Sequence, residues 1–556
     1  MEQDIIRAYG DVGIKWSRKL TNSEFGPEID KAISAIQARA QNIGTNEMAE
    51  VSNHIANQTD FFHNPTFNNL THAATTLSYF EYIAGNISSA LINITSLPML
   101  VWPTLGAKFG FDKAGAAMAR ASKVAVNGMQ NDPKYKKLYD FLMDHAQLKH
   151  TMAREVLEGR RTTTQDFTGI KAKIMDGLSI PMAATEQFNR ATTAVAAYDL
   201  ARAKGMNEQE AMRYALDTVK DLHTSGLAAT APSWMQNPIG RVFFTFKSYT
   251  WNSAFVLARA FHQAFKGESP EVRSMARRQL LGIYGMSMAF AGVKGLPFFG
   301  AVSTLAKMIQ ALFGDDDEPY DLEDELRQSV GELAYKGPVN YFTNLEIANR
   351  VGLAQDLLFR DDPRGVAEHG YVLSAMQQAF GPAGTYAVNV GNAFKMMGEG
   401  HTERAIEAMM PSFLRNGMKG SRNMLEGAQT LKGDPIKEDV SAYSSFMQVL
   451  GFSPADISAN YERSSAAKTY EKDVGARRQK LLNLHDMAKT AGDMDMLADV
   501  KSQISAFNAK HPKDKIDSTT LAKSEAARKA AEKQMIDGVK YNKKLRGEIK
   551  EKFLQD

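Results

Sequence analysis

Two short motifs in this chain combine charged, amide and aromatic side chains at helical spacing. In the first, E-Q-F-N-R, the polar residues considered are Glu186, Asn189 and Arg190. Glu186 and Arg190 stand four residues apart, so on a helix they face each other as an ion pair. Arg190 would keep the Glu186 carboxyl ionised, and an ionised carboxyl cannot act as a general acid. The motif therefore predicts an interaction site and no catalytic centre.

The second motif, N-P-I-G-R-V-F-F-T-F-K-S-Y, runs from Asn237 to Tyr249 and places cations between aromatic rings. Its proline suits the first position of a helix, where the missing N–H has no intrahelical partner to lose. The cations either grip phosphates or lie along apolar surface with their charges in water. We expect this motif to contribute five interaction residues: Pro238, Arg241, Phe243, Phe246 and Lys247.

Helical signals surround both motifs. Gly205 ends the helix that carries the first motif, and Asn207 with Glu210 three residues later predicts a capping box for the next helix. The second motif opens a helix over 237–267 that is apolar on two faces, one of which includes Trp251 and Phe255. Such a helix is either central in a core or touches both a core and a partner.

The second motif resembles the PLxRFG signature of very large, multi-function phage and prophage proteins. Pro238 and Arg241 match that signature, and Ile239 replaces its leucine. Val242 and Phe243 stand where the signature has phenylalanine and glycine. Further segments in the same order extend the resemblance over residues 86–265: G-N-I-S-S-A-L-I-N-I-T-S-L-P at Gly85–Pro98, E-Q-F-N-R, and A-A-Y-D-L-A-R-A at Ala196–Ala203.

This resemblance implies an internal virion protein of a short-tailed phage, packed inside the capsid and ejected ahead of the genome to build a conduit across the host envelope. The implied locations are the virion and, after ejection, the periplasm or inner membrane. The implied partners are other virion and ejection proteins, further copies of the chain, the host inner membrane and non-specifically bound DNA. The alternative is a non-catalytic helical docking domain for a virion-packaged enzyme, such as a polymerase or a peptidoglycan hydrolase.

Composition limits the class of protein. A length of 556 residues allows about two to four domains. A mean hydropathy of −0.33 is not that of an ordinary membrane protein. The chain has no cysteine, which excludes disulfides, thiolate zinc sites and cysteine nucleophiles. It opens with M-E-Q-D, so we expect no signal peptide.

Helical spacing and capping residues recur along the chain, while long strand-like alternation is missing, so the predicted fold is all-α. We expect an elongated multi-helix assembly of four regions. Residues 1–270 form a helical module, 271–315 an apolar helical hairpin, 316–459 a run of short helices punctuated by Gly and Pro, and 460–556 a charged, basic amphipathic arm.

The arm has 21 basic and 15 acidic residues. Apolar spacing predicts one amphipathic helix through Leu497, Val500, Ile504 and Phe507, and another from Ile536 to Phe553, with His511-Pro512 between them. Their apolar stripes are narrow, so we expect these helices to need a partner in order to bury a core.

The apolar block has two halves, Leu280–Val293 and Phe298–Phe313, separated by K-G-L-P. Each half is shorter than the roughly 20 residues that span a bilayer as a helix. This block, like the uncharged stretch Tyr82–Ala107, is either a buried core element or a latent membrane-inserting hairpin. The candidates for membrane contact are Leu280, Phe290, Leu296, Pro297, Phe298, Phe299 and Leu312.

Acidic residues crowd positions 315–325, directly after the apolar block. They lack the glycine and the final glutamate of an EF-hand loop, so we predict a solvated turn that caps a helix over Leu322–Leu333. The sequence has no phosphate-binding G-K-[ST] loop, no H-E-x-x-H and no G-x-S-x-G. His54, His63 and His72 are spaced by nine and share no helical face. We therefore predict no enzyme activity, no cofactor and no metal site.

Overall fold

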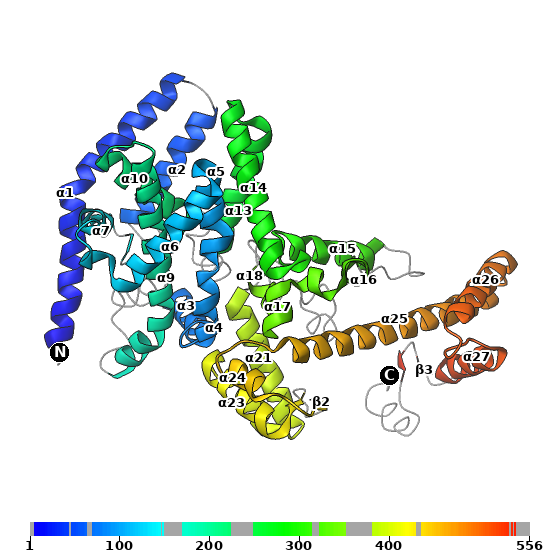
Figure 1. Ribbon diagram of the computed structural model, residues 1–556. Helices are drawn as coiled ribbons and strands as arrows, with labels where there is room; N and C mark the ends of the chain where they lie inside the picture. Colours follow the sequence, from blue (N-terminus) through cyan, green and yellow to red (C-terminus); the bar gives the residue numbers. More distant parts are fainter. Residues whose placement is uncertain are drawn as a thin grey trace, which may run out of the picture. The chain divides into compact units, whose positions relative to one another are not determined.

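A computed structural model describes residues 5–43, 46–63, 69–145, 147–148, 170–223, 248–313, 322–351, 381–429, 435–532, 535–536 and 539–540. The described chain is almost entirely helical, which confirms the all-α prediction (Figure 1). It divides into two compact units. Unit 1 comprises Met1–Phe313 and Tyr320–Glu462, and unit 2 comprises Gly314–Pro319 and Arg463–Asp556. Unit 1 therefore contains nearly all of the first three predicted regions.

The first half of unit 1 is built from helices and short helical turns. In chain order they are α1 (Ile5–Ile43), α2 (Asn46–His63), α3 (Asn69–Tyr82), α4 (Ile87–Ile94), the π-helical turn η1 (Leu97–Val101), α5 (Trp102–Phe109), α6 (Phe111–Asn127), the 3-10 turn η2 (Met129–Asn131), α7 (Lys136–Asp144), α9 (Ile170–Ala203), α10 (Glu208–Leu222) and α13 (Ser248–Lys266).

The second half of unit 1 continues with α14 (Pro270–Ala291), the 3-10 turn η5 (Val293–Gly295), α15 (Phe299–Phe313), α16 (Leu322–Lys336), α17 (Pro338–Thr343), α18 (Ala348–Val351), α21 (Gly381–Gly398), α22 (Thr402–Met409), α23 (Ser412–Glu426) and α24 (Ala442–Val449). Between α23 and α24, β1 (Ala428–Gln429) pairs antiparallel with β2 (Pro435–Lys437). Of the Gly and Pro residues that punctuate this sequence, Gly337, Pro411 and Ser453-Pro454 fall between helices, and Pro338 begins α17.

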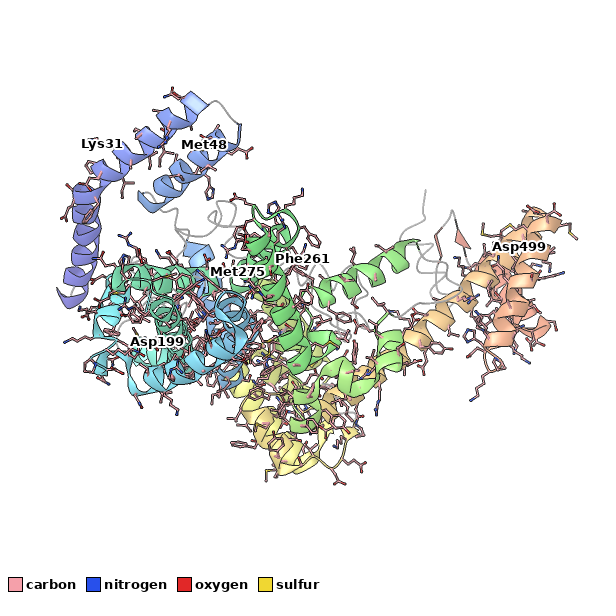
Figure 2. The ribbon with its side chains drawn as sticks, turned by 45° about the horizontal axis from the view of Figure 1, so that its top comes forward. Lys31, Met48, Asp199, Phe261, Met275 and Asp499 are labelled. Atoms are coloured by element: carbon pink, nitrogen blue, oxygen red, sulfur yellow. The ribbon has the colours of Figure 1, made fainter. Side chains whose placement is uncertain are left out.

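The main core of unit 1 lies where α5, α6, α9 and α10 pack in succession, with α14 against α5 and α13 against α14. Its centre consists of small and branched apolar side chains with little or no exposure, among them Leu105, Ala117, Ala197 and Val219. At the rim lies Phe261 of α13 (Figure 2). Its ring meets that of Tyr284 of α14 edge to face, with centroids 6.2 Å apart. Burial of these faces is the main stabilising contribution to unit 1.

Local capping signals are confirmed. Asn207 accepts a hydrogen bond from Glu210 N (2.9 Å), and Glu210 accepts one from Asn207 N (3.0 Å), which together form the predicted box. Gly205, with φ of 95°, lies just beyond the end of α9. Ser269 accepts from Val272 N at the start of α14, where Pro270 takes the first helical position.

Most of the uncharged stretch 82–107 lies in one helical rod, Ile87–Phe109. The rod consists of α4, η1 and α5. The rod contains two prolines, and within it Trp102 N–H bonds to the Leu97 carbonyl five residues back. A π-helical turn of this kind occurs where the regular i→i−4 hydrogen-bond pattern of a helix is interrupted. Among the described helices, this rod is long and apolar enough to cross a membrane, and 56% of its apolar window is buried. A buried core helix of a soluble protein meets the same criteria.

The apolar block forms two helices, α14 and α15, and the interval between Ala291 and Phe299 contains the predicted break, K-G-L-P at 294–297. The two helices do not pack along each other as an antiparallel hairpin would. Instead α14 packs on α5 and α13, whereas α15 packs on η5 and α16 (Figure 1). The reason is local: Phe298 has a left-handed φ of 67° at the start of α15, so α15 leaves the direction of α14.

Unit 2 has a small core of its own. The long helix α25 (Ala455–Ala491) begins in unit 1, and its later part packs with α26 (Met494–Lys510) and α27 (Ser518–Glu532). The buried residues are Leu481, Leu482, Val500, Ile504, Phe507 and Ile516. For the helix through Leu497 and Phe507, the expectation that it needs a partner outside the arm is therefore wrong, because residues of α25 and α27 cover its apolar stripe. The prediction missed α27, whose Leu521 packs against this cluster.

The predicted helix from Ile536 to Phe553 is also corrected. Met535–Ile536 (β3) pairs antiparallel with Val539–Lys540 (β4), and residues 541–556 lie outside the described part of the chain. The sequence between the two strands is Asp-Gly, which is a strong hairpin signal. Apolar spacing alone did not reveal the pairing of β3 with β4.

Candidate functional site

The E-Q-F-N-R motif lies in α9, with its amide and guanidinium buried inside unit 1. The Asn189 side chain is 1% exposed and donates to the Asn93 carbonyl (2.8 Å) and to Ser96 Oγ (3.2 Å). Because Asn93 belongs to α4 and Ser96 directly precedes η1, this one amide ties α9 to both. An amide that bridges backbone and hydroxyl partners in a dry core fixes the register of the helices.

Arg190 and His223 form the other half of this buried polar cluster. Arg190 Nη1 donates to the Gln147 carbonyl at 3.1 Å. His223 follows α10 directly, and its Nε2 lies 2.7 Å from Thr193 Oγ1 of α9. Burial, followed by the charge of Arg190, lowers the pKa of His223 to about 3, so this imidazole is neutral at physiological pH. The cluster holds one cation and a neutral ring among fixed hydrogen-bond partners.

Glu186 acts on this cluster through its charge. Burial lowers the pKa of Arg190, and the carboxylate of Glu186 opposes that shift. The same carboxylate helps to raise the pKa of Tyr79, in α3, to about 12, although burial is the larger cause. The motif thus brings polar groups from α3, α4, α9 and α10 to one place inside unit 1.

The second motif lies mostly outside the described residues, including Pro238, Arg241, Phe243, Phe246 and Lys247. The part of its helix that is described, α13, has the two predicted faces. Val256 and Leu257 are buried in the main core, while the Phe255 ring is 66% exposed. The described helix therefore has one apolar face in the core and one that is exposed.

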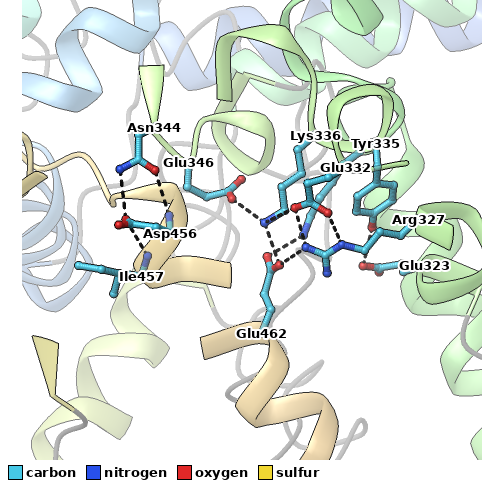
Figure 3. A network of polar contacts seen from close by, with 11 residues as sticks. Glu323, Arg327, Glu332, Tyr335, Lys336, Asn344, Glu346, Asp456, Ile457 and Glu462 are labelled. Carbon is cyan, nitrogen blue, oxygen red and sulfur yellow. Dashed lines mark hydrogen bonds and ion pairs between the residues drawn. The ribbon is translucent and has the colours of Figure 1, made fainter. Parts of the chain in front are cut away.

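A second polar cluster lies where the apolar block meets α16 and the start of α25 (Figure 3). Lys336 Nζ lies 2.9 Å from Glu346 Oε2 and 2.8 Å from Glu462 Oε2. Lys294, in the turn between α14 and α15, lies 3.4 Å from Glu462 Oε1, and Arg327 Nη2 lies 3.1 Å from Glu462 Oε2. One carboxylate on α25 therefore binds three cations from η5 and α16.

This Glu462 cluster is shielded from water, since the Lys294 and Lys336 side chains are 5% and 3% exposed. Burial raises the pKa of Glu462, but the charges of Lys294, Lys336 and Arg327 outweigh it, so the net pKa is lowered. The ring of Tyr335 completes the cluster: its hydroxyl donates to Glu323 Oε2 at 2.9 Å. Ionised side chains at such a site persist only because they are paired.

The burial of Glu323 contradicts part of the prediction that the acidic run is solvated. We expected a solvated turn capping a helix that begins at Leu322, and α16 does begin there. Glu323, however, is 9% exposed and also accepts a hydrogen bond from Ser303 Oγ of α15. The burial follows from the packing of α15 on α16, which the acidic sequence around 315–325 did not indicate.

A neighbouring set of bonds holds the start of α25 to the end of α17. Asn344, with a left-handed φ of 54°, accepts from Ala455 N through its carbonyl (2.8 Å). Its side-chain amide donates to Asp456 Oδ1 at 3.2 Å, and its Oδ1 accepts from Asp456 N at 3.2 Å (Figure 3). Together with Glu462, these bonds anchor the first two turns of α25 in unit 1.

Sequence reasoning missed the Glu462 cluster. The one usable signal was Lys294, a lone charge inside a long apolar stretch. A buried lysine requires a carboxylate, which predicts a partner but not its position. The partner is 168 residues away in the chain, and no local pattern identifies it.

The candidates for membrane contact occupy mixed positions. Leu280, Phe290 and Phe298 are half-buried and pack on the main core, while Pro297 is buried. Leu296 and Phe299 are half-buried, and the side chain of Leu312 lies outside the described set. The most exposed apolar side chains of the block are instead Leu281, Val302, Leu305 and Ile309.

No protein-family model, curated protein or solved structure matches this chain. The resemblance to large phage proteins consequently rests on the quoted motifs alone. Within the described residues, no group of three or more His, Asp or Glu side chains is placed to hold a metal ion.

Proposed function

We propose that this chain is a structural internal virion protein of a short-tailed phage, ejected with the genome and helping to form a conduit across the host envelope. The ordered motifs over residues 86–265 support this proposal, as does the all-α architecture. Both polar clusters also support a structural role, since their side chains bind other parts of the protein interior.

The observation that carries the proposal is the apolar face of α15. Val302, Leu305 and Ile309 are each more than half exposed, in a helix that has no acidic residue. Exposed apolar surface of this kind serves contact with a partner or a lipid surface. We propose that α15 is stored in this state and contacts other copies or the host inner membrane after ejection, because delivery requires two states of similar free energy.

The net positive charge of region 460–556 bears on whether its partner is protein or DNA. The basic region 460–556 is the part that we expect to touch another virion protein, with non-specific DNA contact as the alternative. Binding to DNA would weaken steeply between low and moderate salt, whereas a protein contact built on apolar side chains would be far less sensitive. We expect the protein contact.

A second candidate function is a non-catalytic docking domain for a virion-packaged enzyme. The separate core of unit 2 favours it, because a small module with a core of its own suits recruitment of another protein. The two candidates differ in what accompanies the chain into the host.

Mass spectrometry of purified virions, before and after triggered DNA release, tests the proposal. We expect the chain in intact particles, in several copies, and its loss from emptied particles together with other ejection proteins. Retention in emptied particles would contradict ejection, and absence from intact particles would contradict the virion assignment altogether. Stoichiometric loss together with one large enzyme would favour the docking candidate.

A further inference from the structure

The exposed face of α15 has the sequence pattern of a two-stranded coiled coil. Val302, Leu305 and Ile309 follow one another at intervals of three and four residues, and Leu312 continues the interval in sequence. In a heptad written a to g, Val302 and Ile309 occupy position a, and Leu305 and Leu312 occupy position d. β-branched residues at position a with leucine at position d favour parallel pairs of helices.

The burial of α15 agrees with this register. Val302, Leu305 and Ile309 are 55%, 57% and 51% exposed, whereas Gly300 and Ser303, on the opposite side, are buried. That inner side is held to α16: Phe299 meets the Tyr335 ring edge to face, and Ser303 donates to Glu323. The apolar seam therefore faces away from the rest of unit 1.

We infer that the occupant of this seam is the α15 helix of a second copy of the chain, aligned in parallel. The inference rests on the proposed function, and it specifies how α15 would contact other copies of the chain. The heptad positions beside the seam are Ala306, Met308 and Phe313 in sequence, so no charge there opposes a second helix. DNA is disfavoured as an occupant, because the seam positions carry no charge in sequence with which to bind phosphates.

Two heptads are fewer than a free coiled coil needs. Here the helix is already folded onto α16, so association orders no new backbone. A short seam on a preformed helix gives a weak dimer that forms at high local concentration, as inside a capsid.

The cysteine-free chain allows a direct test. A single cysteine introduced as Leu305→Cys should form a disulfide-linked dimer of the full chain under mild oxidation. Val126→Cys is the matched control, since Val126 is an apolar residue of α6 that is 75% exposed. It should remain monomeric at the same concentration. Equal dimer yields for the two variants, or none for Leu305→Cys, would overturn the inference.

Leu305→Glu gives an independent measurement. Analytical ultracentrifugation should show a concentration-dependent dimer for the wild type and a monomer for the variant, with the thermal unfolding of the two unchanged. If the wild type is monomeric but Leu305→Glu abolishes flotation with anionic vesicles, the seam faces lipid and the second-copy assignment is wrong. If the chain dimerises through the seam but is absent from virions, the proposed function is wrong while the seam dimer stands.

Discussion

The ammonium of Lys336 and the carboxylate of Glu462 lie 2.8 Å apart in the interior of unit 1, although 126 residues separate them in the chain. Glu462 belongs to the long helix α25, and Lys336 ends α16. The same carboxylate binds Lys294, which lies in the turn between the two apolar helices. A single side chain on α25 thus neutralises charge at the point where α14, α15 and α16 meet.

The first prediction concerns the loss of that charge. Glu462→Gln leaves the buried cations with one carboxylate fewer, and removal of one partner from a buried pair costs about 3–5 kcal/mol. All four tryptophans, at positions 16, 102, 234 and 251, lie in unit 1. Tryptophan fluorescence during denaturant unfolding therefore reports the free energy of unfolding of unit 1 alone.

Asp221→Asn is the control for this variant. It removes an ion pair with Arg259 at 2.9 Å whose two side chains are 52% and 40% exposed. Exposed pairs contribute little to stability, so the fluorescence transition should stay near that of the wild type. Similar midpoints for Glu462→Gln and Asp221→Asn would show that the Glu462 cluster is not stabilising.

The second prediction concerns a close backbone contact beside the same cluster. A Cβ at Gly292 would lie 2.5 Å from Ala334 O and from Gly337 N, so Gly292→Ala must displace backbone. Gly205 also has positive φ but has open space around it. Backbone strain of about 1–3 kcal/mol is common to both alanine variants. We expect Gly292→Ala to lower the unit 1 midpoint well beyond Gly205→Ala, and equal shifts would contradict the contact.

The third prediction concerns pH. Glu81 of α3 is 2% exposed and lies 3.3 Å from Arg415 Nη2 of α23. Burial raises the pKa of Glu81 from 4.5 to about 7, and Arg415 opposes the shift only in part. The folded state therefore binds this proton more tightly than the unfolded state. Its contribution to stability is complete below pH 4.5 and is lost as pH rises through about 7.

The difference in unfolding free energy between the wild type and Glu81→Gln isolates this group. From pH 5 to pH 8 we expect the wild type to lose stability relative to the variant by an amount on the order of 2–3 kcal/mol, since one pKa unit corresponds to about 1.4 kcal/mol. Fluorescence-monitored denaturation at each pH measures it. A difference that is constant across this range would mean that Glu81 is ionised throughout.

The accuracy of the sequence predictions depended on how far apart the interacting residues lie. Asn207 and Glu210 are three residues apart, and the capping box they predict is present. The break after α14 could likewise be predicted, because glycine and proline determine the conformation of the backbone at their own positions. The bonds that place α9 on α4 join Asn189 to Asn93, 96 residues away, and periodicity carries no information on such a pairing.

Exposure was equally hard to predict. Hydropathy marked the whole block from Leu280 to Phe313 as apolar, but it could not separate Phe290, which packs on the core, from Leu305, which faces outward. That difference depends on which helices α14 and α15 pack against, a property of the tertiary fold. The same limit hid the burial of Glu323 within an acidic stretch.

The last prediction separates the two units. Phe507 of α26 is fully buried in the core of unit 2, where its ring packs beside His511 with centroids 4.8 Å apart. Phe507→Ala should destabilise unit 2 by about 3–5 kcal/mol through lost contacts and a cavity. Far-UV circular dichroism should then show part of the helical signal melting at a lower temperature, while the tryptophan transition of unit 1 stays unchanged. Met494→Ala, at a position of the same helix that is 73% exposed, should move neither. A fluorescence midpoint that falls together with the dichroism in Phe507→Ala would mean that the two units unfold as one, because the continuous helix α25 would then transmit the loss of the unit 2 core to the Glu462 cluster.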